Sequence, residues 1–256
     1  MNDNEKLVFK LACRSGVLIL ESGGETFRAE ETVRFICSSA GFEANVLALP
    51  TGIFISADVN GEPQSAEVKR VKKRSTDLYS LNEINSISRK FVSGKMDVND
   101  ALAELDALSH RKPVNKLFLI LCAGFSSFFF AILFDGSFFD SVVAFLSSCT
   151  VQAALLYFKR TDIYSFTSNL LVGFIIALYA VLSVSIFSMG NTEAIIVGGI
   201  LPYLPGLAMT NAIRDTMMGD LVSGISRIGD VLLSAVCLAV GAGVVFAVYV
   251  YLGGVV

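Results

Sequence analysis

The first 110 residues change from a helical period of hydrophobic positions to a two-residue period and back again. Apolar residues recur at helical spacing over residues 5–22 and 26–40. Helical spacing returns near Ser80, where Ser80 and Glu83 fit a capping box. Between these helical regions, alternating patterns predict three strands, at residues 45–49, 53–59 and 65–71. The order helix, helix, strands, helix, helix predicts a small α+β domain.

Long runs without charged residues replace these patterns from about residue 116 onward. A transmembrane helix needs about 20 mostly apolar residues, and the uncharged runs provide five such segments. The predicted spans are residues 116–134, 138–158, 166–188, 194–213 and 231–252. We therefore expect an α-helical polytopic membrane protein with an N-terminal α+β domain. The predicted division is a cytoplasmic domain of residues 1–112 and a transmembrane domain of residues 113–256.

Charged residues divide the chain at the same place. Residues 1–116 hold 16 Lys and Arg and 16 Asp and Glu, whereas residues 117–256 hold only four and seven. Overall, 17% of the residues are charged, compared with about 25% in soluble domains. The second part is therefore too apolar to be soluble.

The few basic residues near the spans predict the orientation in the membrane. They are Arg111, Lys112, Lys116, Lys159, Arg160, Arg214 and Arg227. With five spans, all of them fall on one side, and the positive-inside rule makes that side cytoplasmic. We expect a multi-pass protein of the bacterial inner membrane, with a cytoplasmic N-terminus and a periplasmic C-terminus. The polar start argues against a cleavable signal peptide.

Several classes of function find no support in the sequence. The five cysteines show no metal-ligand or C-x-x-C spacing, so we expect no metal site and no cofactor. There is no basic arm with interleaved aromatic residues, which argues against nucleic acid as a partner. His110 is the only histidine and lies in the predicted linker, and no nucleophile or phosphate-binding motif is present. We expect a protein that is not an enzyme.

The fourth predicted span is interrupted. Two prolines and three glycines occur within nine positions, and Pro202, Pro205 and Gly206 form the end of this group. Each proline removes a backbone donor and crowds the preceding turn of a helix. Discontinuous membrane helices of this kind build substrate sites in transporters. The alternative is a simple proline kink. We favour the substrate site, because polar residues follow the break.

Residues 210–227 follow the break and read as one continuous helix with an apolar stripe. The candidate site residues on its other faces are Asn211, Arg214, Asp215, Asp220 and Arg227. Ionisable residues this close to a membrane site are usually paired and often functional. Asp215 or Asp220 is the candidate for proton coupling, and Arg214 the candidate for a substrate carboxylate. Arg227 is either a functional residue or a topology anchor.

Three segments carry a resemblance to a known family. They are Leu20-Glu21-Ser22-Gly23-Gly24-Glu25-Thr26, Pro50-Thr51-Gly52, and the run from Pro205-Gly206 through Asn211-Ala212-Ile213-Arg214-Asp215 to Gly219-Asp220 and Ser223-Gly224. Together they resemble the threonine/serine exporter family over almost the whole chain. The last run is the specific part of the resemblance.

The resemblance implies a function and a partner. Members of this family occur as one long chain of about ten spans or as two chains, and this chain looks like the larger, YjjP-type component of the two-chain form. Its companion would be a smaller membrane subunit of the YjjB type, and a higher oligomer is compatible with this plan. The implied activity is export of C4-dicarboxylates such as succinate, or of threonine and serine.

Two other readings compete with a secondary exporter subunit. The first is a membrane-anchored cytoplasmic sensor or hydrolase-like enzyme, because family members have been described with a hydrolase-like N-terminal region. The second is a structural assembly factor for other membrane proteins. The first leaves the interrupted fourth span unexplained. Nothing in the sequence excludes the second, and the family resemblance is the main argument against it.

Overall fold

The computed structural model describes residues 2–59, 62–72, 74–111, 114–158 and 165–253. The chain forms two compact units. The first contains Met1–Lys112 together with Gly206–Gly229, and the second contains Pro113–Pro205 together with Asp230–Val256. The first unit thus includes a segment, Gly206–Gly229, that follows the interrupted span in the sequence.

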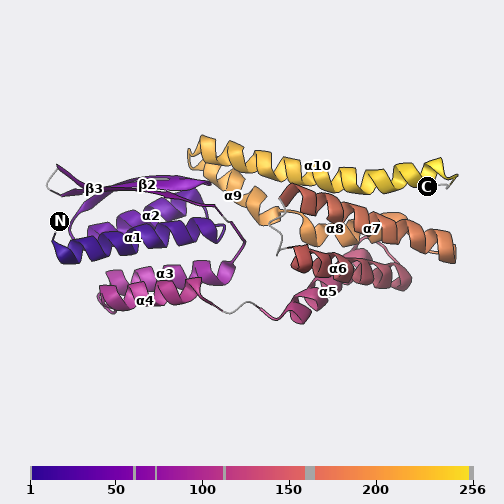
Figure 1. The fold of residues 1–256 in the computed structure, drawn as a ribbon, viewed down its shortest axis with the longest axis horizontal. Coiled ribbons are helices and arrows are strands. Elements are labelled where there is room, and N and C mark those ends of the chain that lie inside the picture. The colour runs from indigo at the N-terminus through magenta and orange to yellow at the C-terminus, as the bar shows by residue number, and fades with distance from the viewer. Residues whose placement is uncertain (1, 60–61, 73, 112–113, 159–164, 254–256) are drawn as a thin grey trace. The chain divides into compact units, whose positions relative to one another are not determined.

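The N-terminal part of the first unit has three layers (Figure 1). Its elements are α1 (Asp3–Glu21), α2 (Thr26–Ser39), β1 (Glu43–Leu49), β2 (Gly52–Val59), β3 (Glu62–Arg70), α3 (Leu78–Val92) and α4 (Val98–Ser109). The strands form an antiparallel sheet in the order β1-β2-β3. Helices α1 and α2 pack on the sheet, and α3 and α4 pack on the other side of α1. The predicted α+β arrangement is present.

The core of this unit follows from the helical and alternating spacing of its apolar residues. The largest fully buried side chains include Leu11, Leu20, Val33, Ile36, Ile53, Ile84 and Leu105. They come from α1, α2, β2, α3 and α4, so every layer contributes to one hydrophobic cluster. Each fully buried aliphatic side chain contributes about 1.5–3 kcal/mol relative to exposure. The unit therefore has a substantial core, which can hold its surface turns in place.

The predicted capping box at Ser80 is wrong. Helix α3 begins at Leu78, and its N-cap is Asp77. The Asp77 carboxylate accepts from the backbone N–H of Ser80 at 3.1 Å and from the Ser80 hydroxyl at 2.7 Å. An aspartate is as good an N-cap as a serine, and here it satisfies the amide and the hydroxyl of Ser80 together.

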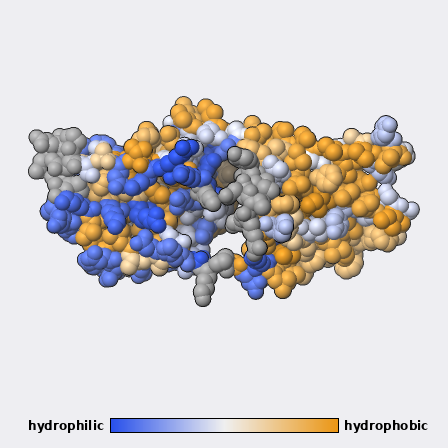
Figure 2. Space-filling model, in the orientation of Figure 1, coloured by the Kyte–Doolittle hydropathy of each residue, from blue (hydrophilic) through white to orange (hydrophobic). Residues whose placement is uncertain are grey.

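The second unit consists of apolar helices. They are α5 (Lys116–Leu133), α6 (Phe138–Phe158), α7 (Ser165–Phe187) and α8 (Thr192–Ile200), followed by the 3-10 turn η2 (Leu201–Tyr203), together with the part of α10 (Leu221–Tyr251) that begins at Asp230. On the face shown in Figure 2, hydrophobic residues predominate over this unit. Among the described residues, four helices are long and apolar enough to cross a membrane, or five if the broken pair around Pro205 counts as one span.

The predicted span at residues 194–213 is two helices joined by a short break. Helix α8 runs into η2, so Pro202 lies inside a tight 3-10 turn, near its start, where proline is tolerated. Leu204 is extended, and α9 (Gly206–Met217) begins directly after Pro205. The break is therefore at Leu204–Pro205, with Pro202 just before it.

Helix α10 is longer than the fifth predicted span. It starts at Leu221, ahead of residue 231, and it continues through Arg227 and Asp230, the charged residues that precede the uncharged run. Three basic residues used above to predict orientation, Lys112, Lys159 and Arg160, lie outside the described residues.

Candidate functional site

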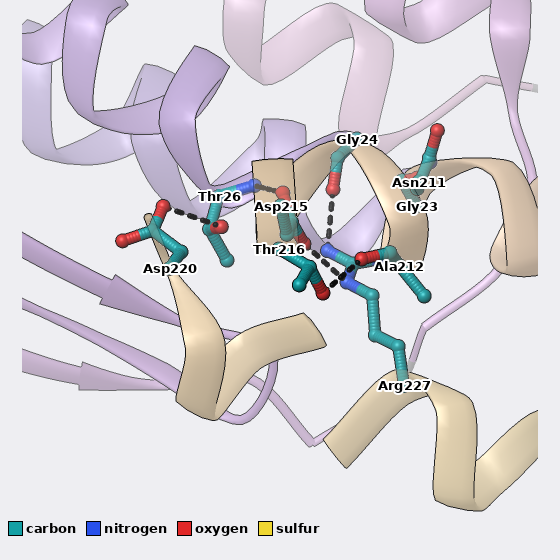
Figure 3. A network of polar contacts seen from close by, with 9 residues as sticks. All are labelled: Gly23, Gly24, Thr26, Asn211, Ala212, Asp215, Thr216, Asp220 and Arg227. Atoms are coloured by element: carbon teal, nitrogen blue, oxygen red, sulfur yellow. Dashed lines mark hydrogen bonds and ion pairs between the residues drawn. The ribbon is translucent and has the colours of Figure 1, made fainter. Parts of the chain in front are cut away.

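The described polar candidates of the Gly206–Gly229 segment gather on one turn of the N-terminal layers (Figure 3). The turn joins α1 to α2 and contains Gly23, Gly24 and Glu25. About 190 residues of sequence separate the two partners, as in the bonds from Thr26 to Asp215 and Asp220. Both belong to the same compact unit. The site is therefore a contact within the first unit.

Residues 210–227 do not form the single helix expected from their spacing. Helix α9 ends at Met217, and Gly219 has a φ of +95°, which favours glycine. The N–H of Gly219 donates to the Thr216 carbonyl at 3.2 Å, and the N–H of Asp220 donates to the Asp215 carbonyl at 2.9 Å. This pair of bonds is a Schellman motif. The chain then reverses into α10, so the segment is a helical hairpin.

Close packing holds the two arms of this hairpin together. A Cβ on Gly224 would lie 2.0 Å from the Thr216 hydroxyl oxygen and 3.0 Å from the Ala212 carbonyl oxygen. The Thr216 hydroxyl itself donates to the Ala212 carbonyl at 2.9 Å. Only glycine allows this approach, so the hairpin sets the position of Asp215 on one arm and of Arg227 on the other.

The turn between α1 and α2 is a second Schellman motif. Gly23 has a φ of +80°, its N–H donates to the Leu20 carbonyl at 3.1 Å, and the Gly24 N–H donates to the Ile19 carbonyl at 2.8 Å. The next helix, α2, has Glu25 as N-cap, but the Glu25 side chain makes no capping bond. The carbonyls of Gly23 and Gly24 and the first amide of α2 are thus available to a partner.

Asp215 supplies the missing cap of α2. Its Oδ1 accepts from the backbone N–H of Thr26 at 3.2 Å. Its Oδ2 lies 3.0 Å from Nε of Arg227, and the side chains of both residues are buried. The Arg227 guanidinium also donates to the Gly24 carbonyl at 2.7 Å. A carboxylate at a helix N-terminus is favoured by the helix dipole, and a buried ion pair persists only with such additional hydrogen bonds.

Two further bonds extend the contact on either side of this ion pair. The Thr26 hydroxyl donates to Oδ2 of Asp220 at 3.2 Å. The Asn211 side-chain amide donates to the Gly23 carbonyl at 2.8 Å. Thr26 is therefore bonded to both aspartates of the hairpin, to Asp215 through its backbone and to Asp220 through its side chain (Figure 3).

Arg214 occupies a different environment from Arg227. It forms an ion pair with Glu25. The Arg214 side chain is 57% exposed, whereas that of Arg227 is 7% exposed. Asp215 is thus paired with Arg227, and Glu25 with Arg214. Arg214 is the more accessible cation.

The remaining sequence candidates lie where the chain passes from the second unit to the first. Pro202 and Pro205 belong to the second unit, and Gly206 is the first residue of the first unit after the break. A Cβ on Gly206 would meet nothing within 4 Å. The break thus coincides with the passage of the chain from one unit to the other.

Sequence reasoning missed Glu25, Thr26 and the carbonyls of Gly23 and Gly24. The signal was present, because Ser22-Gly23-Gly24-Glu25 is polar and glycine-rich, but a turn between helices accounts for that pattern by itself. Among the described residues, no group of three or more His, Cys, Asp or Glu could hold a metal ion. The arrangement can hold two carboxylates and an arginine in fixed positions.

Comparison with known proteins gives one family. Residues 10–249 match the family model described as "Putative threonine/serine exporter". The "Threonine/serine exporter" of Corynebacterium glutamicum is 25% identical over 245 residues, which cover 92% of this chain and 50% of that protein. The "Probable threonine/serine exporter" of Mycobacterium tuberculosis is 25% identical over 91% of this chain and 45% of its own length. The chain thus spans about half the length of these two relatives.

A shorter relative matches over nearly its full length. The "Probable succinate transporter subunit YjjP" of Escherichia coli is 18% identical over 243 residues, which cover 93% of this chain and 94% of that protein. No solved structure matches the chain.

Proposed function

Because the chain belongs to the threonine/serine exporter family, we propose that it is one subunit of a secondary exporter of small polar metabolites. The observation that carries the proposal is the break at Pro205, which is followed directly by a hairpin with a buried ion pair. Interrupted helices supply transporters with a hinge and with free backbone groups. The matched family is a transporter family, so a sensor, hydrolase-like enzyme or assembly factor is not pursued further.

The proposed substrates are C4-dicarboxylates such as succinate, or threonine and serine. The names of the relatives support both classes, because two relatives are called threonine/serine exporters and the YjjP relative a succinate transporter subunit. All of these compounds carry a carboxylate. Because Arg214 is the accessible arginine, we propose it as the group that binds that carboxylate, with help from Asn211.

The other candidate residues take separate roles in this proposal. Pro202, Pro205 and Gly206 keep the backbone out of a regular helix at the break. Asp215 and Asp220 are the proton-coupling candidates, and Arg227 is the partner of Asp215 in the buried ion pair. Arg227 is therefore proposed as a functional partner rather than only a topology anchor.

We also propose a companion and an orientation. Two relatives are about twice as long as this chain, and the YjjP relative is named a subunit. A smaller membrane subunit of the YjjB type would supply the missing half, in the lipid bilayer of the bacterial inner membrane. Residues 1–112 would be cytoplasmic and the C-terminus periplasmic, as the basic residues predict.

The test is efflux of labelled succinate and labelled threonine from membrane vesicles. The chain is examined alone, with the companion subunit, and as a pair that carries Asp215→Asn. We expect efflux of one substrate from the pair and at least a tenfold loss with Asp215→Asn, about 1.4 kcal/mol by the usual conversion. The matched control is Asp100→Asn, at an exposed aspartate of α4.

Three outcomes decide the proposal. Efflux from the intact pair that falls with Asp215→Asn and not with Asp100→Asn supports a two-chain exporter. Efflux from the chain alone refutes the requirement for a companion. A correctly assembled pair that exports neither compound argues against both proposed substrate classes.

A further inference from the structure

Thr26 occupies an unusual position for a residue that opens a helix. It is fully buried, and it is bonded to two carboxylates of a segment almost 190 residues away in the sequence. Its N–H donates to Asp215 and its hydroxyl donates to Asp220. One residue of the N-terminal layers therefore binds both of the proposed coupling aspartates.

The two acceptors of Thr26 sit on opposite sides of the Schellman turn. Asp215 lies in α9, and Asp220 is the N-cap residue of α10, whose carbonyl accepts from the Gly224 N–H at 2.9 Å. The amide and the hydroxyl of one threonine thus bond the two carboxylates that flank the turn. A change in the turn at Gly219 that alters the separation of the two carboxylates strains these bonds.

The hairpin begins and ends where the chain passes from one unit to the other. The chain enters it at Pro205–Gly206 and leaves it at Gly229–Asp230. Added Cβ atoms on Gly206 and on Gly229 would meet nothing within 4 Å. The contacts with the α1–α2 turn join the hairpin to the N-terminal layers.

We propose that Thr26 is a positioning residue of the transport site, which holds Asp215 and Asp220 in register and so makes the N-terminal layers a working part of the exporter. The proposal rests on the exporter function proposed above and adds the element that controls its coupling residues. It predicts that the Thr26 hydroxyl matters through Asp220, in addition to any contribution to stability.

The experiment compares two substitutions that differ by one hydroxyl. Thr26→Val keeps the shape and the backbone N–H but removes the donor to Asp220, whereas Thr26→Ser keeps the donor. The matched control is Thr32→Val in the same helix, because the Thr32 hydroxyl bonds only locally, to the Arg28 carbonyl at 2.8 Å. Efflux of labelled succinate and threonine is measured in the assembled pair, and amide hydrogen exchange of residues 215–227 in the purified chain.

We expect Thr26→Val to lower efflux about tenfold, as for loss of a hydrogen bond to a charged acceptor. Thr26→Ser restores most of the activity, and Thr32→Val leaves it unchanged. Asp220→Ala combined with Thr26→Val is no worse than Asp220→Ala alone, because the two act through one bond. Hydrogen exchange in the hairpin rises with Thr26→Val and not with Thr32→Val.

The outcomes separate this proposal from the exporter function. If the wild-type pair exports substrate and Thr26→Val behaves like Thr32→Val in both measurements, Thr26 is not a positioning residue. If the wild-type pair exports neither compound, the proposed substrate classes fail, while hydrogen exchange still decides whether Thr26 holds the hairpin. If Thr26→Val does not fold, a Thr26→Ser variant with efflux as low as that of Asp220→Ala overturns the role of the hydroxyl.

Discussion

Helices α8 and α9 are separated by only a few residues of sequence but are held by different forces. In α8, Gly198 packs on α5 so closely that an added Cβ would lie 2.6 Å from the backbone nitrogen of Ala131. Gly199 packs in the same way on Ile176 of α7. In α9, only Ala212 and Asp215 are buried, and the helix is held by polar contacts with the α1–α2 turn.

This difference indicates which of the two helices can change its position. Close-packed apolar contacts have one arrangement that fits, and small displacements cost contact energy at once. Hydrogen bonds and ion pairs contribute less in net terms, because water or another charged group can replace a partner. Since α9 depends on replaceable partners, we infer that it is the half of the interrupted span that can rearrange around substrate or protons.

The largest loss of stability is expected at the buried polar contacts of α9. Asp215→Ala leaves Arg227 buried without its ion-pair partner and removes the cap of α2. Loss of one partner of a buried pair costs about 3–5 kcal/mol, and we expect this loss in the free energy of unfolding of the first unit. Denaturant unfolding in detergent, followed by hydrogen exchange, measures it.

The double variant Asp215→Ala with Arg227→Met is the control for this effect. If an unpaired charge causes the loss, the double variant is more stable than Asp215→Ala alone, because neither charge of the pair remains. Equal or greater destabilisation in the double variant contradicts this cause. The hairpin would then depend on the individual bonds to Thr26 and Gly24 rather than on charge pairing.

The next largest effects on stability are expected from substituting one glycine in α8 and one in α9. Gly198→Ala places a methyl group against the α5 backbone, and overpacking of this kind costs about 1–3 kcal/mol. Gly206→Ala, in the first turn of α9, meets open space and gains up to about 1 kcal/mol from the lower backbone entropy of alanine. Thermal unfolding in detergent compares the two variants. Similar effects of both substitutions would remove the contrast between the halves.

Much of the fold could be predicted from the sequence, because local periodicity reports local structure. The helical and alternating patterns gave α1, α2 and the three strands to within a few residues. The start of α3 was missed, because Asp77 and Ser80 are both good caps and Glu83 favoured the wrong one. The uncharged run begins only after Asp230, so it did not show that α10 already begins at Leu221.

The candidate site was only half predictable for a related reason. Asn211, Asp215 and Arg227 were recognised by their type, since polar residues near membrane spans are conspicuous. Their pairing was not, because the reversal at Gly219 turns one apparent helix into two arms. Residue spacing shows which face of a helix a side chain occupies. It does not show that the face will meet Thr26, which depends on the tertiary structure.

A smaller effect on stability tests a polar contact near the end of the close-packed half. The Tyr203 hydroxyl in η2 donates to the Ser148 carbonyl of α6 at 3.0 Å. Tyr203→Phe removes this bond and keeps the ring, so we expect a loss of about 0.5–1.5 kcal/mol. Thermal unfolding measures it, with Tyr157→Phe, at an exposed position on α6, as the control. A larger loss would mean that α8 also depends on polar contacts.

The smallest effect on stability is expected at the exposed edge of the polar half, where Arg214 pairs with Glu25. Arg214→Gln removes an ion pair whose arginine is mostly in solvent, which costs about 0.2–1 kcal/mol. This loss shrinks as salt rises from about 0.1 M to about 1 M, because the screening length falls from about 10 Å to about 3 Å. Efflux, however, falls much further, since Arg214 is the proposed carboxylate-binding group. Unfolding and vesicle efflux measured together on Arg214→Gln decide between the roles: a loss of stability with unchanged efflux would make Arg214 a docking residue only and would leave the substrate without its proposed cation.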